Sequence, residues 1–170
     1  IAGSYDKENN MFIDKEASMM NDPEANESLN PATNTTIGCI VTNAKLNQAQ
    51  VNKLAQAAHD GYARAIYPTH CPSDGDTIFA VAYGNVTTQA QTWDQVTPDL
   101  NLISVLAVNA MERAIVSAGA NAETLPGAPN VVGAASLDTP PAQAVSTNRA
   151  VIDEITIDPA KHVKNAAVSS

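Results

Sequence analysis

Two strand-like segments alternate with two helical segments in this chain, and this alternation constrains the fold more than any other feature. Residues 36–43 and 77–84 are rich in β-branched or aromatic residues and apolar through their centres. Helix-forming stretches follow them, over residues 48–67 and about 99–118. The order strand–helix–strand–helix favours an α/β fold, and strands this apolar are typical of sheets covered on both faces.

Capping signals support both helices. Asn47 stands three residues before Gln50, the spacing of a capping box, and Pro68 cannot continue a helix, so the first helix should end near residue 67. Asp99 is a suitable N-cap for the second helix, and Gly119 is a suitable stop.

Two strands are too few to bury the apolar surface that these segments carry. A two-stranded sheet is marginally stable at best, and strands covered on both faces need neighbours. We therefore expect the chain to be part of a larger fold or of an obligate oligomer.

Composition narrows the class of protein. The chain has 170 residues, of which 44% are hydrophobic and 16% charged, enough for one core. A net charge of −9 and a pI near 4.5 argue against nucleic acid and against anionic membrane surfaces as partners. No uninterrupted apolar run approaches the roughly 18 residues of a membrane-spanning helix, so we expect no membrane partner. The two cysteines suggest neither a disulfide framework nor a metal site.

The chain divides into three parts. Residues 1–34 are acidic and contain turn signals, which favours a loop or linker. Residues 35–119 hold the alternating strands and helices. Residues 120–170 are interrupted by prolines and favour an extended tail, with one strand candidate at residues 152–157.

A nucleophile can arise where the linker meets the first strand, at Asn34-Thr35-Thr36. If the bond between Asn34 and Thr35 breaks, Thr35 gains a free α-amine beside its own hydroxyl. An N-terminal amine is a known base for activating a threonine nucleophile.

A second candidate site is Asp74-Gly75-Asp76, directly before the second strand. The glycine lets the backbone turn so that both carboxylates converge, and such a pair can orient a hydroxyl or shuttle a proton. The alternatives are an acidic turn that caps backbone amides, and a weak cation site. His70 is the better candidate for a neighbour of this site, His59 is expected at the solvent or the core edge, and the histidines form no metal cluster.

Four segments together resemble one family, the self-cleaving N-terminal-nucleophile peptidases. It includes L-aminopeptidase/D-esterase, the β-peptidyl aminopeptidases and the nylon-oligomer hydrolases. The resemblance rests on residues 34–38, 54–66, 68–70 and 74–80 and extends over about half the chain. Asn-Thr-Thr followed by Asp-Gly-Asp-Thr is far more specific than either motif alone.

The resemblance implies roles for individual residues. Thr35 matches the nucleophile, freed by cleavage after Asn34, and Asp74 and Asp76 match the pair that positions it. It also implies a four-layer αββα sandwich, usually in tetramers or larger homo-oligomers, that hydrolyses amide bonds near a free amine in amino-acid amides, short peptides or ω-amino-acid oligomers. No cofactor or metal is implied.

The sequence also departs from the family. The family's larger N-terminal portion, with its oxyanion donors, has no counterpart here, so the chain is expected to be the C-terminal portion and to need a companion N-terminal (α) chain. Loss of one oxyanion donor costs on the order of 10²–10³ in rate. The alternative is a non-catalytic structural subunit derived from the family.

Overall fold

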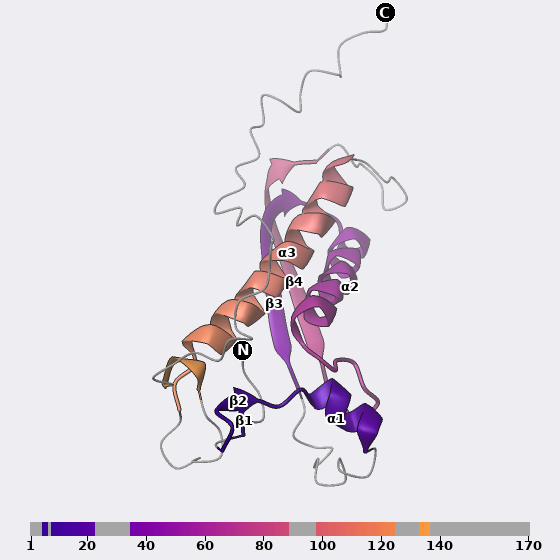
Figure 1. The fold of residues 1–170 in the computed structure, drawn as a ribbon. Helices are drawn as coiled ribbons and strands as arrows, with labels where there is room; N and C mark the ends of the chain where they lie inside the picture. The colour runs from indigo at the N-terminus through magenta and orange to yellow at the C-terminus, as the bar shows by residue number, and fades with distance from the viewer. Residues whose placement is uncertain (1–4, 7, 23–34, 89–97, 125–132, 137–170) are drawn as a thin grey trace, which may run out of the picture.

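The computed structural model describes residues 5–6, 8–22, 35–88, 98–124 and 133–136. In chain order the elements are β1 (Tyr5–Asp6), β2 (Met11–Phe12), α1 (Lys15–Asn21), β3 (Ile37–Lys45), α2 (Gln48–Ala65), β4 (Thr77–Thr87), α3 (Pro98–Asn121) and the 3-10 helix η2 (Ala134–Ser136). Elements β3, α2, β4 and α3 form one mixed α/β unit (Figure 1). The predicted order strand–helix–strand–helix is confirmed.

Capping explains where α2 lies, and α3 departs from the prediction. The Asn47 side chain accepts the Gln50 backbone N–H, and the Gln50 side chain accepts the Asn47 N–H, which completes the expected capping box. Helix α2 ends at Ala65, just before Pro68. The predicted stop at Gly119 was wrong, because α3 continues through it to Asn121. A helical glycine costs only about 0.5–1 kcal/mol relative to alanine, so it does not by itself end a helix.

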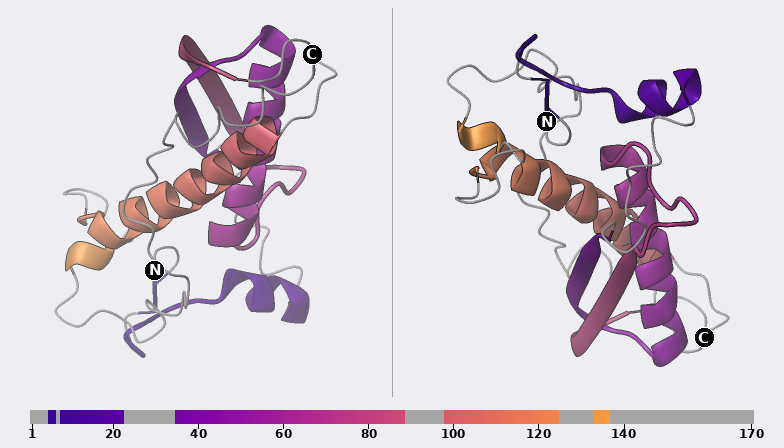
Figure 2. Two further views of the ribbon diagram at one scale, coloured as in Figure 1. Left: turned by 90° about the horizontal axis from the view of Figure 1, so that it is seen from above. Right: turned by 90° about the horizontal axis from the view of Figure 1, so that it is seen from below.

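Strands β3 and β4 pair in parallel and start level with each other. Ile37 lies opposite Thr77, and the register continues to Thr42 opposite Ala82 before an irregularity. A parallel pair needs a crossover connection, and α2 supplies it. Both helices lie on the same side of the sheet (Figure 2).

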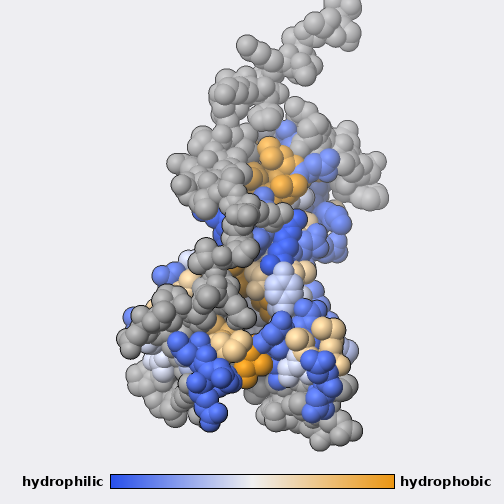
Figure 3. All heavy atoms as spheres, viewed as in Figure 1, coloured by the Kyte–Doolittle hydropathy of each residue, from blue (hydrophilic) through white to orange (hydrophobic). Residues whose placement is uncertain are grey.

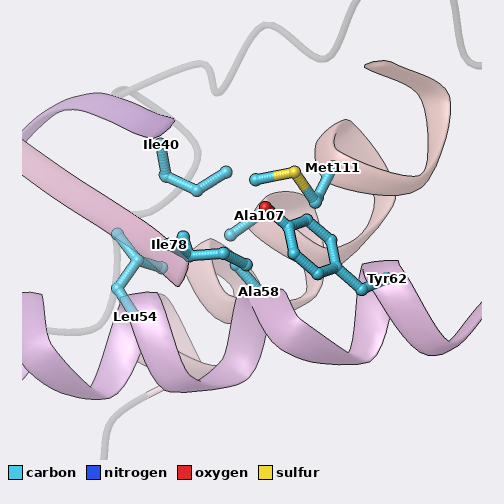
Figure 4. Close-up of a cluster of buried hydrophobic side chains, with 7 residues drawn as sticks. All are labelled: Ile40, Leu54, Ala58, Tyr62, Ile78, Ala107 and Met111. Carbon is cyan, nitrogen blue, oxygen red and sulfur yellow. The ribbon is translucent and has the colours of Figure 1, made fainter. Parts of the chain in front are cut away.

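The core lies between the sheet and the two helices (Figure 4). It comprises one side chain from each strand, three from α2 and two from α3: Ile40, Ile78, Leu54, Ala58, Tyr62, Ala107 and Met111. The helices approach closely because α2 carries Gly61, where a Cβ atom would lie 2.7 Å from the Val108 carbonyl oxygen. A larger residue would push α3 away from α2.

The other face of the sheet is uncovered in the described residues. Alternate side chains of β3 and β4 point away from the helices, and the large apolar ones are 50–71% exposed: Ile37, Val41, Phe79, Val81 and Tyr83. The expectation that both faces are covered therefore does not hold for this chain by itself. The helices cover one face only, since both follow their strands onto the same side.

Helix α3 is also only partly covered. Asp99–Asn121 is long and apolar enough to cross a membrane by length and composition: an 18-residue stretch within it has a mean hydropathy of 1.4, and 17% of that stretch is buried. Polar residues such as Asn109 and Glu112 interrupt this helix. Its sequence therefore contains no unbroken apolar run of that length. Core helices of soluble proteins pass the same test. Here Ala107, Val108 and Met111 pack against the rest of the unit.

The N-terminal segment contains short elements that were not predicted. Strands β1 and β2 form an antiparallel pair, and the Asp14 side chain caps α1 by accepting the Ala17 N–H. These elements lie at the end of the molecule where β3 and β4 begin (Figure 1). The division into residues 1–34, 35–119 and 120–170 stays a prediction. Residues 23–34 and most of the tail, including 152–157, lie outside the described residues.

Candidate active site

Parallel pairing places the two predicted motifs at one edge of the sheet. Thr35 and Thr36 directly precede β3, Asp74 and Asp76 directly precede β4, and the two strands start level. Segments 40 residues apart in sequence therefore meet. Thr35 is exposed, and Asn34 lies outside the described residues.

Hydrogen bonds hold the Thr36 backbone from both sides. Its N–H donates to Asp76 Oδ1 over 3.0 Å, and its carbonyl oxygen accepts the Thr77 N–H over 2.9 Å and the Tyr62 hydroxyl over 3.4 Å. Gly38 gives Tyr62 the necessary room, because a Cβ atom there would lie 2.6 Å from the tyrosine oxygen. Thr36 is thus held in place by hydrogen bonds. Because Thr35 is joined to Thr36 by a peptide bond, the position of Thr35 is restricted as well.

Asp76 is the centre of this arrangement. Its side chain is only 3% exposed, and Oδ2 accepts the Thr69 hydroxyl over 2.8 Å and lies 3.0 Å from His70 Nδ1. Burial alone would raise the pKa of Asp76, but hydrogen bonds from the Thr69 hydroxyl and the Thr36 amide outweigh it and lower this pKa. These contacts favour an ionised Asp76 carboxylate that accepts hydrogen bonds.

Asp74 behaves in the opposite way. Burial, together with a hydrogen bond to Asp76 and the charge of Asp76, raises the pKa of Asp74. The turn that carries it is closed by the Asp74 N–H donating to the Cys71 carbonyl over 2.8 Å. Two carboxyl groups whose pKa values are pushed apart divide naturally into a proton donor and an acceptor. The hydrogen bond between the two carboxyl groups agrees with the expected convergence of their side chains, and their role in the reaction stays a prediction.

Comparison with known proteins identifies the family. The model of "Peptidase family S58" matches residues 4–132, most of the chain. The chain belongs to peptidase family S58.

Curated relatives of this S58 chain carry hydrolase names. An uncharacterized aminopeptidase of Mycobacterium tuberculosis (strain ATCC 25618 / H37Rv) is 40% identical over 101 residues, which cover 56% of this chain and 29% of the relative. One from Mycobacterium leprae is 40% identical over 105 residues, 59% of this chain and 29% of the relative. A 6-aminohexanoate-oligomer endohydrolase of Agromyces sp. (strain KY5R) is 33% identical over 89 residues, 51% and 25% respectively. The S58 chain thus spans less than a third of these relatives.

Two histidines extend the site of the S58 chain. His70 contacts Asp76, as expected of a site neighbour, and its Nε2 lies 3.3 Å from His59 Nδ1. Sequence reasoning missed His59, which was assigned to the solvent or the core edge. The available signal was its position three residues before Tyr62, since these two residues share a helix face and their rings contact edge to face. Burial and the charge of His70 lower the pKa of His59, against the opposing charges of Asp76 and Asp60.

A groove adjoins the site of the S58 chain. It has a volume of about 1200 Å³ and runs between β3 and α3, with Thr36 and Gly38 among its lining residues and Leu102 and Leu106 on the helix side. Apolar side chains gather at the surface where the first turns of α3 lie beside the sheet (Figure 3). Among the described residues of the S58 chain, no group of three or more His, Cys, Asp or Glu side chains is arranged to hold a metal ion.

Proposed function

We propose that this chain is the nucleophile-bearing part of an N-terminal-nucleophile amide hydrolase that cleaves itself between Asn34 and Thr35. The observation that carries the proposal is the hydrogen bond from the Thr36 N–H to Asp76. It fixes the residue after the candidate nucleophile beside a pair of carboxyl groups with opposite pKa shifts.

Self-cleavage would proceed by acyl transfer from nitrogen to oxygen. The Thr35 hydroxyl oxygen attacks the Asn34 carbonyl carbon, the hydroxyl proton moves to the Thr35 nitrogen, and the C–N bond breaks to leave an ester. Water then hydrolyses the ester, which gives an Asn34 carboxylate and restores the Thr35 hydroxyl. Asp74, whose pKa is raised by burial and by Asp76, would relay that proton from the hydroxyl to the departing nitrogen.

Turnover would use the same atoms. The free α-amine of Thr35, with a reference pKa of about 7.7–8.0, takes the hydroxyl proton near neutral pH. The hydroxyl oxygen attacks a substrate amide carbon, the leaving amine takes the proton, and water hydrolyses the resulting ester. Asp76, ionised and buried, would keep the strand that carries Thr35 in register during both half-reactions.

The remainder of the fold would come from a companion chain. The uncovered apolar face of β3 and β4 and the groove beside α3 suit contact with further strands, which would complete an αββα sandwich. The match to less than a third of the relatives' length supports this proposal. The companion N-terminal chain would contribute the oxyanion donors, and homo-oligomers would form from the completed units.

The substrate class follows from the names of the relatives. One group is named aminopeptidase and the other 6-aminohexanoate-oligomer endohydrolase, and both names describe cleavage of amide bonds. We propose amino-acid amides, short peptides or ω-amino-acid oligomers as substrates. A panel of amino-acid p-nitroanilides and 6-aminohexanoate oligomers would separate these classes.

The decisive experiment is intact-mass analysis with N-terminal sequencing of the complete gene product. We expect a split that exposes Thr35, its absence in Thr35→Ala, and its return in Thr35→Ser, which keeps a hydroxyl. An intact wild-type chain without amidase activity would favour the alternative, a non-catalytic structural subunit. That alternative is supported only by the uncovered sheet face.

A further inference from the structure

We propose that His59 and His70 form a two-imidazole chain that positions the Asp76 carboxylate on the Thr36 N–H, with His70 as the positioning residue and His59 as the group that binds the second ring nitrogen of His70 and holds that ring in place. This inference rests on the function proposed above and assigns the site two further residues. The chain of contacts runs from His59 Nδ1 to His70 Nε2 over 3.3 Å, then from His70 Nδ1 to Asp76 Oδ2 over 3.0 Å.

The chemistry of the groups fixes the direction of these hydrogen bonds. An ionised carboxylate only accepts, so His70 Nδ1 must carry a proton. When the His70 ring is neutral its Nε2 is an acceptor and His59 Nδ1 donates to it, whereas a charged His70 ring donates from Nε2 to His59 Nδ1. With both rings neutral, Asp76 therefore determines the tautomer of His70, and His70 determines that of His59.

The backbone of His70 supports a dedicated role. Its φ angle is 58°, in the left-handed region, which is costly for most residues other than glycine and in which asparagine, aspartate and histidine are enriched among the rest. A strained residue held in place by its surroundings is typical of functional sites. This conformation lets the side chain of His70 turn back to Asp76, six residues later.

The rings are also held by packing. His70 stacks on Tyr62 with ring centroids 5.9 Å apart and lies 4.9 Å from the His59 ring. Tyr62 is fully buried and reaches the Thr36 carbonyl oxygen. The histidine chain, through Asp76, and the tyrosine thus reach the N–H and the carbonyl oxygen of the same residue, Thr36.

Substitutions at His70 separate the effect of its hydrogen-bond donor from the effect of its side-chain volume. His70→Asn keeps a donor near the place of Nδ1 and tolerates the left-handed backbone, whereas His70→Gly keeps the backbone and removes the donor. We expect self-cleavage to slow by about ten- to a hundredfold in His70→Gly, the range expected for losing a hydrogen bond to a charged group. We expect His70→Asn to restore the rate to within about threefold of wild type. Gln48→Ala, at an exposed position of the same helix as His59, is the control.

A readout independent of activity is the tautomeric state. In the pH range where both rings are neutral, long-range ¹⁵N–¹H NMR of the complete gene product should show a proton on Nδ1 of both His59 and His70. In His59→Phe, which keeps a ring against Tyr62, His70 should keep the proton on Nδ1, and the ¹⁵N chemical shift of its Nε2 should move because that nitrogen loses its hydrogen-bond donor. A wild-type His70 protonated only at Nε2, or a His70→Gly protein that cleaves itself at the wild-type rate, would overturn the inference.

These outcomes are separable from those of the proposed function. If the wild-type protein never exposes Thr35, the proposed function fails while the tautomers still report on the histidine chain. Circular dichroism shows whether His70→Gly folds. If it does not fold, the tautomers of the wild-type protein and the self-cleavage rate of His59→Phe test the inference instead. A His59→Phe protein with an unchanged rate and an unchanged ¹⁵N chemical shift of His70 Nε2 counts against the role of His59.

Discussion

The Thr36 N–H donates to Asp76 Oδ1 over 3.0 Å across 40 residues of sequence. The same offset of 40 relates Ile37 to Thr77 in the parallel register. The contact is therefore an extension of the sheet, in which a side chain takes over where the strand pairing ends. Anything that shifts β3 against β4 shifts the nucleophile segment against its aspartates.

Replacing Asp76 tests this contact. Asp76→Asn leaves only one side-chain oxygen, so either the Thr36 N–H at Oδ1 or the Thr69 hydroxyl and His70 Nδ1 at Oδ2 would face an amide nitrogen instead of an acceptor oxygen. We expect self-cleavage to slow by about 10²-fold or more, by analogy with the loss of a general acid–base group. Time-resolved intact-mass analysis measures this rate. Glu123→Gln, which removes one exposed carboxylate elsewhere, should leave it unchanged, and equal rates in the two variants would contradict the prediction.

Asp74 is expected to lower the stability of the protein at neutral pH and to raise its rate of self-cleavage. Because its pKa is raised in the folded state, the stability it contributes is complete below its unfolded pKa of about 3.9 and is lost as pH rises through the folded value. Asp74→Asn should therefore raise the melting temperature at pH 7 and lower the rate of self-cleavage. The gain in stability should vanish near pH 3. A loss of stability at pH 7 would argue against the repulsion between the two carboxylates.

Asp76 should give the opposite pH dependence. Its pKa is lowered in the folded state, since the hydrogen bonds from Thr69 and Thr36 outweigh the effect of its burial. The stability it contributes is present above about pH 3.9 and is lost as pH falls through its folded pKa. Acid titration followed by circular dichroism should show the wild type losing more stability below pH 4 than Asp76→Asn. Parallel titration curves would contradict this prediction.

The core should be sensitive at Leu54. This side chain is 2% exposed and packs in the cluster between α2 and the sheet. Leu54→Ala should lower the free energy of unfolding by about 2–5 kcal/mol, through lost burial and the cavity left behind. Lys53→Ala, at the exposed neighbouring position, should change it by no more than about 0.5 kcal/mol. Urea denaturation of both variants measures the difference.

The uncovered sheet face offers a test of assembly. Phe79 is 58% exposed at the centre of that face, opposite Cys39 in the register. If a companion chain covers it, Phe79→Lys should shift the assembled species toward smaller ones in size-exclusion chromatography with light scattering. Gln56→Lys adds the same charge at an exposed position of α2 and should leave the size unchanged. An unaltered size for Phe79→Lys would contradict coverage of this face.

Much of the fold follows from local signals. The capping box at Asn47 and the proline at position 68 mark the limits of α2 closely, because both act on backbone groups within one turn. The prediction that Gly119 ends α3 was wrong, since a single glycine costs too little to end a helix by itself. The short helix α1 was missed because seven residues carry too little periodicity to recognise.

The sequence pointed to the two aspartates and to His70 as a neighbour of their turn, but it did not point to His59. Asp74 and Asp76 stand out because a glycine between two carboxylates is unusual directly before a strand. His59 acquires its partner only through the return of the chain at His70, whose left-handed backbone no sequence rule specifies. The role of Thr35 as nucleophile stays a prediction, to be decided by the mass of the chain.

The hydrogen bonds on Thr36 all lie downstream of the nucleophile. They engage its N–H and its carbonyl oxygen, through Asp76 on one side and Thr77 and Tyr62 on the other. Cutting the backbone between Asn34 and Thr35 would therefore leave these hydrogen bonds in place. A precursor and its mature product could share one geometry at this position, so that maturation would unmask a base without requiring the site to be rebuilt.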